Sequence, residues 1–425
     1  MKKSYLMVAV TASMLAFTAC SNDEEATKMN EDSTTQTLIV QVASAGDGLT
    51  TRAGRPLYSS AAAQDIDNVK VVVYAAGGKI AYEKNLDDWK TISKAYTTNG
   101  HGLQYTLTLK GADKLVAGTY TVLAVGYAKN SDYTYSPSLA SLAKDASYTA
   151  PITATIGTGK EVEEVFAGEA ALKVPADNDQ AFNAPVTLHR QVAGGFGYFK
   201  NIPAAVDGNT AKTLRLVASA KNTAVEFKNF NGTFTEAPNG VQYIVNGTTP
   251  ATEEAGILFS DATTKGYVVY SIDLSTWFPN GDTDNNGILN NSDNGWVNPT
   301  AGLSVVKGSV FAGKFIIPFG YVDGKNTMEL QLLAGDGSII KHWTVKVPAV
   351  APDVTAPQVK DQSVNVYNVV RNHMYNIGVK VANPTDPTEP EEKPDVEVPE
   401  DLSKGQDLIL KVNDNWELIH QMELE

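Results

Sequence analysis

The chain has 425 residues, of which 43% are hydrophobic, and 34 Lys and Arg against 48 Asp and Glu give a formal net charge of −14. This length allows two or three domains with ample cores, and the acidic balance argues against nucleic acid as a partner, because negative surfaces repel phosphate backbones. The single cysteine excludes an intramolecular disulfide and a multi-thiolate metal site.

The N-terminal segment predicts export. Two lysines precede a mostly apolar stretch at 5–17, which is too short to span a membrane and is typical of a signal peptide. The stretch ends close to Cys20, in a setting that resembles a bacterial lipobox. We therefore expect residues 1–20 to be a lipoprotein signal peptide and Cys20 to be lipidated. The acidic run at 21–25 resembles the surface-export signal of Bacteroidetes lipoproteins.

Short alternating segments predict an all-β protein. In the first of them, 37–44, the apolar residues Leu38, Val40 and Val42 share one face. A short helix is expected at 138–144. Strands of similar pattern are expected at 69–74, 79–84, 103–110, 119–127, 186–199, 213–218, 267–274, 309–319, 327–333, 338–347 and 375–381. This number and spacing of strands predicts two tandem β-sandwich domains, which we place at 53–182 and 183–383.

Motifs of known enzymes are missing from the sequence. The five histidines are scattered and form no HExxH pair, and neither a GxSxG elbow nor a Walker loop occurs. The glycines Gly194, Gly195 and Gly197 lie inside a strand-like run, where they indicate a bulge or a close approach of the backbone rather than a phosphate cradle. We expect a protein that is not an enzyme.

One segment, 282–293, has the spacing of a twelve-residue calcium loop. Hard cations take oxygen ligands at loop positions 1, 3, 5, 7, 9 and 12, with glycine at position 6, and Gly287 occupies that position. The final Asp in place of Glu resembles dockerin-type loops. A polar surface loop without a cation is the alternative. The predicted ligands of a structural Ca²⁺ are Asp282, Asp284, Asn286, the carbonyl of Ile288, Asn290 and Asp293.

The C-terminal segment, 384–425, combines a Pro/Glu-rich spacer with an alternating strand. The spacer cannot bury a core and is expected to be extended, leaving the tail apart from both sandwiches, so that deletion of 406–425 spares their folding. A lone strand needs a partner. It is either a donor strand for another subunit or a last strand that folds back on its own sheet. The apolar residues of the predicted donor strand are Trp416, Leu418, Met422 and Leu424.

Taken in order, these pieces resemble the Bacteroidetes fimbrillins, the subunits of type V pili. The matching pieces are the lipobox at Cys20, the strand at 37–44, Thr51-Arg52-Ala53-Gly54, the segments 165–169, 188–193 and 370–376, and the strand around Trp416. The likeness covers nearly the whole chain, although the calcium-type loop is not a hallmark of the family.

The resemblance implies β-sandwiches of transthyretin-like or Greek-key type and a maturation step. An Arg-specific protease would cut between Arg52 and Ala53 and remove a propeptide, 21–52, that contains the first strand. A strand from the next subunit would then take its place. A nearby second arginine, Arg55, leaves the cleavage position open.

The predicted function is that of a fimbrial stalk subunit, a structural pilin for surface adhesion. It would be made as an outer-membrane lipoprotein precursor, held by its lipid before cleavage, and would form a head-to-tail homopolymer in the fimbrium at the cell surface. The alternatives are an anchor or tip pilin, and a surface lipoprotein that binds glycans, for which Trp277 and Trp296 could supply an aromatic platform.

Overall fold

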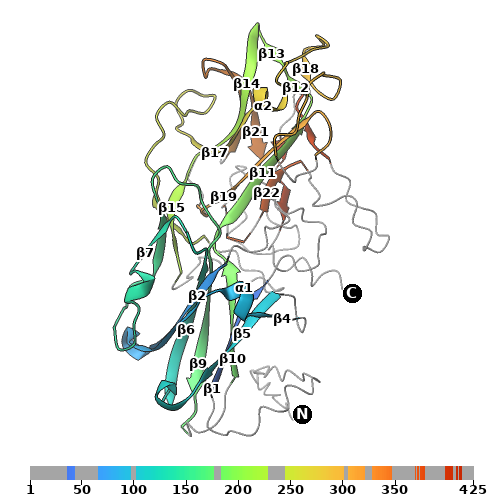
Figure 1. Ribbon diagram of the computed structural model, residues 1–425. Coiled ribbons are helices and arrows are strands. Elements are labelled where there is room, and N and C mark those ends of the chain that lie inside the picture. The colour runs from blue at the N-terminus through green and yellow to red at the C-terminus, as the bar shows by residue number, and fades with distance from the viewer. Residues whose placement is uncertain are drawn as a thin grey trace, which may run out of the picture.

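The computed structural model describes residues 36–43, 66–96, 102–176, 183–227, 245–300, 305–320, 328–346, 369, 371–372, 374–378, 398–404, 408–409 and 411–413. In this part of the chain, strands form almost all of the regular structure, as Figure 1 shows. The α-helices α1 (Trp89–Ile92) and α2 (Leu274–Trp277) have four residues each. The prediction of an all-β protein is therefore confirmed. No helix in these ranges is both long and apolar enough to cross a membrane.

The first half of the chain builds an eight-stranded sheet in the order β3-β2-β6-β9-β10-β1-β5-β4. Its strands are β1 (Gln36–Ala43), β2 (Asn68–Ala75), β3 (Ile80–Leu86), β4 (Lys94–Tyr96), β5 (Gly102–Leu109), β6 (Gly118–Tyr127), β9 (Phe166–Val174) and β10 (Asn183–Arg190). Strands β9 and β10 pair only through His189↔Ala167 and Arg190↔Phe166. The two parts of the sheet therefore turn toward each other and enclose one core, to which both contribute buried residues.

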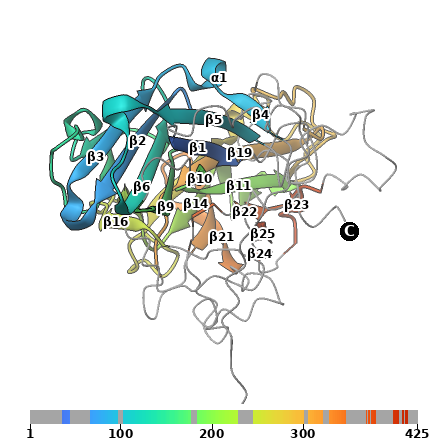
Figure 2. The same cartoon turned by 90° about the horizontal axis from the view of Figure 1, so that it is seen from below.

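Strand β1 lies inside this sheet, as Figure 2 shows. It runs parallel to β10, from Thr37↔Asn183 to Val42↔Leu188, and antiparallel to β5. The expected alternation holds where the side chains are described, because Leu38 and Val40 are 1% and 0% exposed. The first predicted strand is thus confirmed to within one residue at either end.

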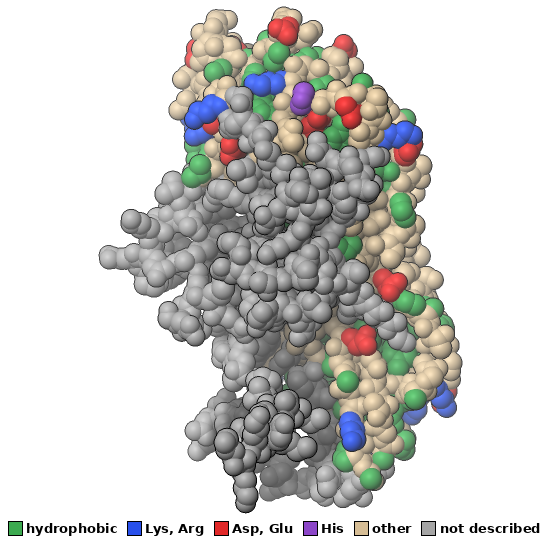
Figure 3. Space-filling model, turned by 180° about the vertical axis from the view of Figure 1, so that it is seen from behind, with side chains coloured by type: hydrophobic (Ala, Val, Ile, Leu, Met, Phe, Trp, Pro, Cys, Tyr) green, Lys and Arg blue, Asp and Glu red, His purple; other side chains and the backbone are tan. Residues whose placement is uncertain are grey.

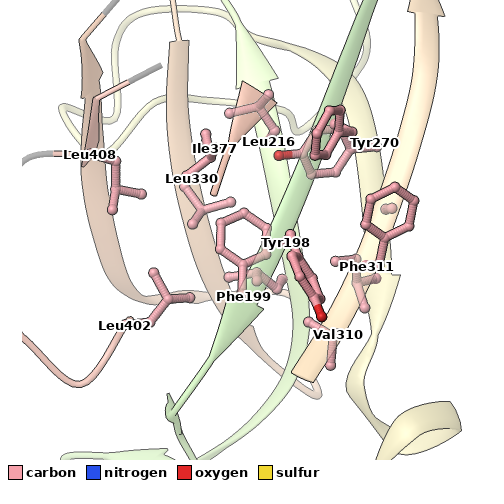
Figure 4. Packing of buried hydrophobic residues seen from close by; sticks show 14 of the residues in the cluster. Tyr198, Phe199, Leu216, Tyr270, Val310, Phe311, Leu330, Ile377, Leu402 and Leu408 are labelled. Atoms are coloured by element: carbon pink, nitrogen blue, oxygen red, sulfur yellow. The ribbon is translucent and has the colours of Figure 1, made fainter. Parts of the chain in front are cut away.

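Besides a two-stranded sheet described below, the second half forms two larger sheets, ordered β19-β11-β22-β25 and β13-β14-β20-β21-β24, to which β23 and β17 are added through β11 and β14. Their strands are β11 (Ala193–Lys200), β13 (Ala205–Val206), β14 (Asn209–Ala218), β17 (Tyr267–Asp273), β19 (Ser309–Ile316), β20 (Met328–Ala334), β21 (Ile339–Lys346), β22 (Met374–Ile377), β23 (Glu400–Asp401), β24 (Leu408–Ile409) and β25 (Lys411–Asn413). Aromatic and aliphatic side chains from both sheets meet in one core, shown in Figure 4.

The glycines of β11 make room for neighbouring side chains. A Cβ on Gly197 would lie 2.3 Å from the Tyr270 hydroxyl, and one on Gly195 would lie 2.8 Å from Cδ1 of Ile316. The pairing of β11 with β19 runs from Ala193↔Ile316 to Lys200↔Ser309 without a shift in register. These glycines therefore serve close packing in the core, which is the close approach expected from the sequence, and not a bulge.

A four-stranded sheet joins the two halves. In the order β16-β15-β8-β7 it combines β7 (Tyr133–Ser136) and β8 (Thr153–Ile156) from the first half with β15 (Asn222–Glu226) and β16 (Gly247–Pro250) from the second. Figure 1 shows β7 and β15 beside the junction. A third core, which includes buried residues of β2 and β6 together with Val225 and Phe227, lies against this sheet.

The chain crosses between the halves at residues 191–192. The single strand expected at 186–199 is wrong, because β10 belongs to the first sheet and β11 to the second half. By sheet membership, the first half therefore reaches Arg190, a few residues beyond the predicted division after 182. The helix expected at 138–144 is a three-residue 3₁₀ turn, Leu139–Ser141.

Candidate functional site

The candidate site is the β1 slot, which we define as the position between β5 and β10 that β1 fills. Leu38 faces Leu107 across the β1–β5 pair, and both are buried in the same core as Val186 and Leu188 of β10. Full burial of an aliphatic side chain stabilises a fold by ~1.5–3 kcal/mol. Leu38 and Val40, with the backbone hydrogen bonds to both neighbours, therefore hold β1 firmly in the slot.

Residues 44–65 connect β1 to Ile66, the next described residue, two positions before β2 begins. This connection contains Arg52, Ala53 and Arg55, and like Cys20 it lies outside the described residues. The predicted cleavage and lipidation sites therefore stay predictions. A cut in this connection would leave β1 attached by non-covalent contacts only. Its departure would expose the unpaired edges of β5 and β10 and an apolar strip between them, which is a template for another strand.

The described part of the C-terminal segment folds back on the second half. Strand β24 runs parallel to β21, and β25 is antiparallel to β22. Leu408 is 0% exposed and belongs to the second core, because its side chain fills the space between the two sheets (Figure 4). The expectation that the tail from residue 406 onward is isolated from both sandwiches is therefore wrong for 408–409 and 411–413.

The predicted donor residues Trp416, Leu418, Met422 and Leu424 lie outside the described residues. The two readings of the tail therefore apply to different parts of it. Self-pairing holds for residues 408–409 and 411–413, and strand donation stays a prediction for the residues that follow.

The junction of the two halves contains a buried ion pair. The Arg190 Nε donates to Oε1 of Glu164 at 2.7 Å, and the two side chains are only 4% and 6% exposed. The Arg190 guanidinium also donates to Oδ1 of Asn372 at 3.4 Å and lies over the Phe166 ring at 5.1 Å. The three segments 165–169, 188–193 and 370–376, which carried the resemblance, thus meet at one place.

Gln191 extends this network. Its Nε2 donates to the carbonyl of Ala167 at 2.9 Å, and its Oε1 accepts from Arg371 at 2.9 Å and from Asn246 at 3.0 Å. The backbone N–H of Asn372 donates to the carbonyl of Val192 at 2.9 Å. Sequence reasoning missed this network, since its members lie far apart in the chain. The only signal was a set of polar residues inside strand-like runs.

The predicted calcium loop brings its carboxylates together. Side-chain oxygens of Asp282, Asp284 and Asp293 all lie within 4.8 Å of one another. Asp282 accepts from the backbone N–H of Gly287 at 2.8 Å, and Gly287 has a φ of 82°, which glycine adopts without strain. Asp293, only 1% exposed, accepts from the backbone N–H of Asn290 at 2.8 Å.

The other predicted ligands lie nearby. Asn286 donates from its side chain to Asp284 at 2.9 Å, and the Asn290 side chain donates to the carbonyl of Ile288 at 3.0 Å. Loss of solvation, together with the carboxylates of Asp282 and Asp293, raises the pKa of Asp284 above 3.8. Three acidic groups this close repel one another, and a divalent cation would remove that repulsion.

Strand pairing holds the loop to the second half. β18 (Ile288–Leu289), within the loop, pairs with β12 (Ile202–Pro203). Among the described residues, the helix closest before the loop is the four-residue α2. Within the described ranges, the loop is therefore not flanked by the long helices of a helix-flanked calcium loop.

The two tryptophans proposed as a glycan platform pack against each other, with ring centroids 6.5 Å apart. Trp277 is only 3% exposed, and the Trp296 indole donates to the carbonyl of Ser309 at 2.9 Å. Their rings therefore stabilise the fold beside the loop. They do not form an open platform.

A cavity of about 420 Å³ lies where the β8–β9 connection, the end of β14, β17 and β19 meet. Its walls are mostly apolar, and the ion pairs of Lys314 with Glu161 and of Lys221 with Glu254 lie at it. On the face in Figure 3, charged side chains of the described residues lie dispersed among uncharged ones.

The family model of the fimbrillin-A associated anchor proteins Mfa1 and Mfa2 matches residues 5–274. The chain belongs to this family. The resemblance to Bacteroidetes fimbrillins is thereby confirmed, and as a member of a fimbrial family the protein belongs to the cell-surface fimbrium and assembles with other fimbrial subunits. No curated protein matches the chain.

The comparison with solved structures gives matches of low sequence identity and low TM-score. A putative adhesin from Bacteroides ovatus is 13% identical, with a TM-score of 0.39 over 81% of this chain and 88% of that one. The fimbrial anchor protein Mfa2 from Porphyromonas gingivalis is 8% identical, with a TM-score of 0.34 over 81% and 90%. The tip fimbrial protein Mfa3 from the same organism, with a C-terminal truncation, is 12% identical, with a TM-score of 0.34 over 89% and 99%. Likenesses at this level do not bear on function.

Proposed function

We propose that this fimbrial protein is a stalk subunit, structural and not enzymatic, that polymerises by strand exchange in its β1 slot. The observation that carries the proposal is the place of β1. It is an interior strand, paired on both sides, yet it precedes the rest of the fold and is joined to it by the single connection 44–65. One cut there can therefore empty an interior position of the sheet without dividing the remaining fold.

In the proposed sequence of events, Cys20 is lipidated and holds the precursor at the outer membrane. An Arg-specific protease then cuts between Arg52 and Ala53, which releases both the lipid and β1. The open slot accepts the tail of a neighbouring subunit, with Trp416 and Leu418 among its apolar residues. Because donor and slot lie on different parts of the chain, the contact is head-to-tail and extends into a filament.

The structure supports the energetics of this exchange. Leu38 and Val40 leave two fully buried sites in the slot, and refilling each with an apolar side chain contributes ~1.5–3 kcal/mol. The hydrogen bonds to β5 and β10 add to this. The tail can be donated only from Asp414 onward, because Lys411–Asn413 pairs with β22 of its own subunit.

Stalk assembly is tested by the N-terminal residue of the protein recovered from the cell surface. We expect Ala53. The double variant Arg52→Ala/Arg55→Ala should leave a lipidated monomer that retains β1 and does not polymerise. Normal filaments from this variant would refute the proposal.

An anchor is the second candidate, because the description of the family names anchor proteins. An anchor would keep Cys20, its lipid and β1 in the assembled fimbrium. The same N-terminal measurement separates the two roles. A lipidated Cys20 on the protein at the base of assembled fimbriae would identify an anchor.

We further propose that the loop 282–293 binds a structural Ca²⁺ through the six residues named above. Three carboxylates within 4.8 Å of one another support a hard divalent cation, whose role would be to stiffen the loop beside β12. Calorimetry should detect binding that the variant Asp282→Ala/Asp284→Ala loses. Equal heats from both proteins would leave the loop a polar surface turn.

A further inference from the structure

Gln36, the first residue of β1, is buried at one end of the β1 slot. Its side-chain amide contacts both backbone groups of a single residue: Nε2 donates to the carbonyl of Leu115 at 2.9 Å, and the N–H of Leu115 donates to Oε1 at 2.7 Å. Gln36 is 0% exposed and Leu115 is 3% exposed. A side-chain amide thus pairs with Leu115 in the way that a neighbouring strand would.

This contact adds a polar site to an otherwise apolar slot. Leu115 lies between the 3₁₀ turn Gly111–Asp113 and β6, so Gln36 ties the start of β1 to the opposite part of the sheet. Within 36–40, the part of the strand whose side chains are described, Gln36, Leu38 and Val40 are the buried positions. The slot therefore presents one polar site followed by two apolar sites, spaced two residues apart.

The polar site can distinguish registers that apolar contacts cannot. If the incoming strand is shifted by one residue, every side chain turns to the opposite face, and the alternation of apolar and polar residues excludes that register. A slip of two residues keeps the alternation, and Leu, Val or Met fit the apolar sites nearly alike. Such a slip would place an apolar side chain against Leu115 and leave its buried N–H and carbonyl without hydrogen bonds, which is strongly unfavourable.

We infer that the backbone of Leu115 sets the register of any strand that fills the β1 slot, and that His420 of a second copy of this chain takes the place of Gln36 there. The inference rests on the proposed strand exchange. By their alternation in the sequence, Trp416, Leu418, His420, Met422 and Leu424 would share one face of an extended tail, and His420 is the polar one among them.

His420 suits this position chemically. A neutral imidazole carries one N–H donor and one acceptor nitrogen, so it can hydrogen-bond to either backbone group of Leu115. Apolar residues lie two and four positions away on both sides of His420. The sites of Leu38 and Val40 can therefore be filled whichever way the incoming strand runs.

The first test uses the full chain, cut in vitro by an arginine-specific protease in the connection 44–65. The rate at which the β1 segment leaves the cut protein is followed through a fluorophore at its N-terminus. Gln36→Met, which keeps length but removes both hydrogen bonds, should speed release roughly tenfold or more. Thr37→Val, on the half-buried face, is the control and should change little. An unchanged rate for Gln36→Met would overturn the inference.

The second test uses filaments of the full chain and leaves β1 intact. His420→Leu should speed the denaturant-induced dissociation of subunits roughly tenfold, whereas His420→Gln should restore the wild-type rate. Gln421→Leu, on the other face of the tail, is the matched control. Wild-type behaviour of His420→Leu would refute the part of the inference that concerns His420.

The two tests separate this inference from the proposed function. If cut wild-type protein forms no filaments while Gln36→Met still releases β1 faster, the strand exchange and the role of His420 are both wrong, and Leu115 is confirmed as a register site for β1 alone. If filaments form and neither Gln36→Met nor His420→Leu has an effect, strand exchange stands and the register site is refuted.

Discussion

Leu38 and Leu107 allow a direct test of whether β1 leaves the protein during maturation. The two residues face each other across β1 and β5 and are 1% and 5% exposed in the same core. Leu38 lies in the strand that the proposed cleavage removes, whereas Leu107 stays. Truncation of either to Ala should lower the free energy of unfolding of the uncleaved monomer by about 2–5 kcal/mol, because each change leaves a cavity in the closed core.

In assembled filaments the two variants should behave differently. Leu38→Ala should leave the denaturant midpoint of filament dissociation unchanged, since residue 38 is no longer present. Leu107→Ala should lower it, because Leu107 lines the slot that the incoming strand fills. The monomers are compared by guanidinium unfolding of proteins that also carry Arg52→Ala and Arg55→Ala, and the filaments by the fraction of subunits released at each denaturant concentration.

The reasoning fails if Leu38→Ala filaments dissociate as readily as Leu107→Ala filaments. That result would mean that β1 remains in its slot in the assembled fimbrium, as expected for an anchor. Equal stability of the uncleaved wild-type, Leu38→Ala and Leu107→Ala monomers would be a different failure. It would show that Leu38 and Leu107 do not pack as the fold requires.

Three further predictions follow from the junction, the loop and the tail. Glu164→Gln should lower the free energy of unfolding, measured in urea, by about 3–5 kcal/mol, because the buried guanidinium of Arg190 loses its ion-pair partner. Removing the carboxylate of an exposed ion pair costs only about 0–1 kcal/mol. In calcium-free buffer, the contribution of Asp284 to thermal stability should fall as pH rises from 3.8 through its raised pKa, since the folded state binds that proton more tightly than the unfolded chain. With saturating calcium the contribution should instead rise with pH, because a bound cation favours the ionised carboxylate. Truncation after Asn413 should leave the melting temperature unchanged and stop elongation. Truncation before Leu408, which is 0% exposed, should lower the melting temperature. An equal effect of both truncations on the melting temperature would contradict the division of the tail into a self-paired part and a donated part.

Local patterns in the sequence were enough to predict the features that depend on neighbouring residues. Strand β1 was predictable because burial on alternate residues is a local property of an extended chain. The calcium-type loop was predictable for the same reason. Its predicted ligands lie within twelve consecutive residues, so a single turn at Gly287 brings Asp282, Asp284 and Asp293 together.

The sequence did not indicate which strand lies beside which, since pairing depends on segments far apart in the chain. The continuous pattern at 186–199 predicted one strand, yet the chain leaves one sheet and enters another at Gln191. Strands β7, β8, β15 and β16 were not predicted, and neither was the sheet they form across the junction. Short strands with weak alternation become stable only when a distant partner covers them.

The sequence by itself determined an exported, all-β chain of the fimbrillin type, because composition, alternation and short motifs are properties of local sequence. Only the tertiary structure decided that β1 is an interior strand, that Leu408 belongs to the second core, and that Arg190 meets Asn372, 182 residues away. The physical reason is that buried contacts between distant segments gain their free energy only after the chain has closed the loops between them. No local pattern records which of the possible closures is the most stable.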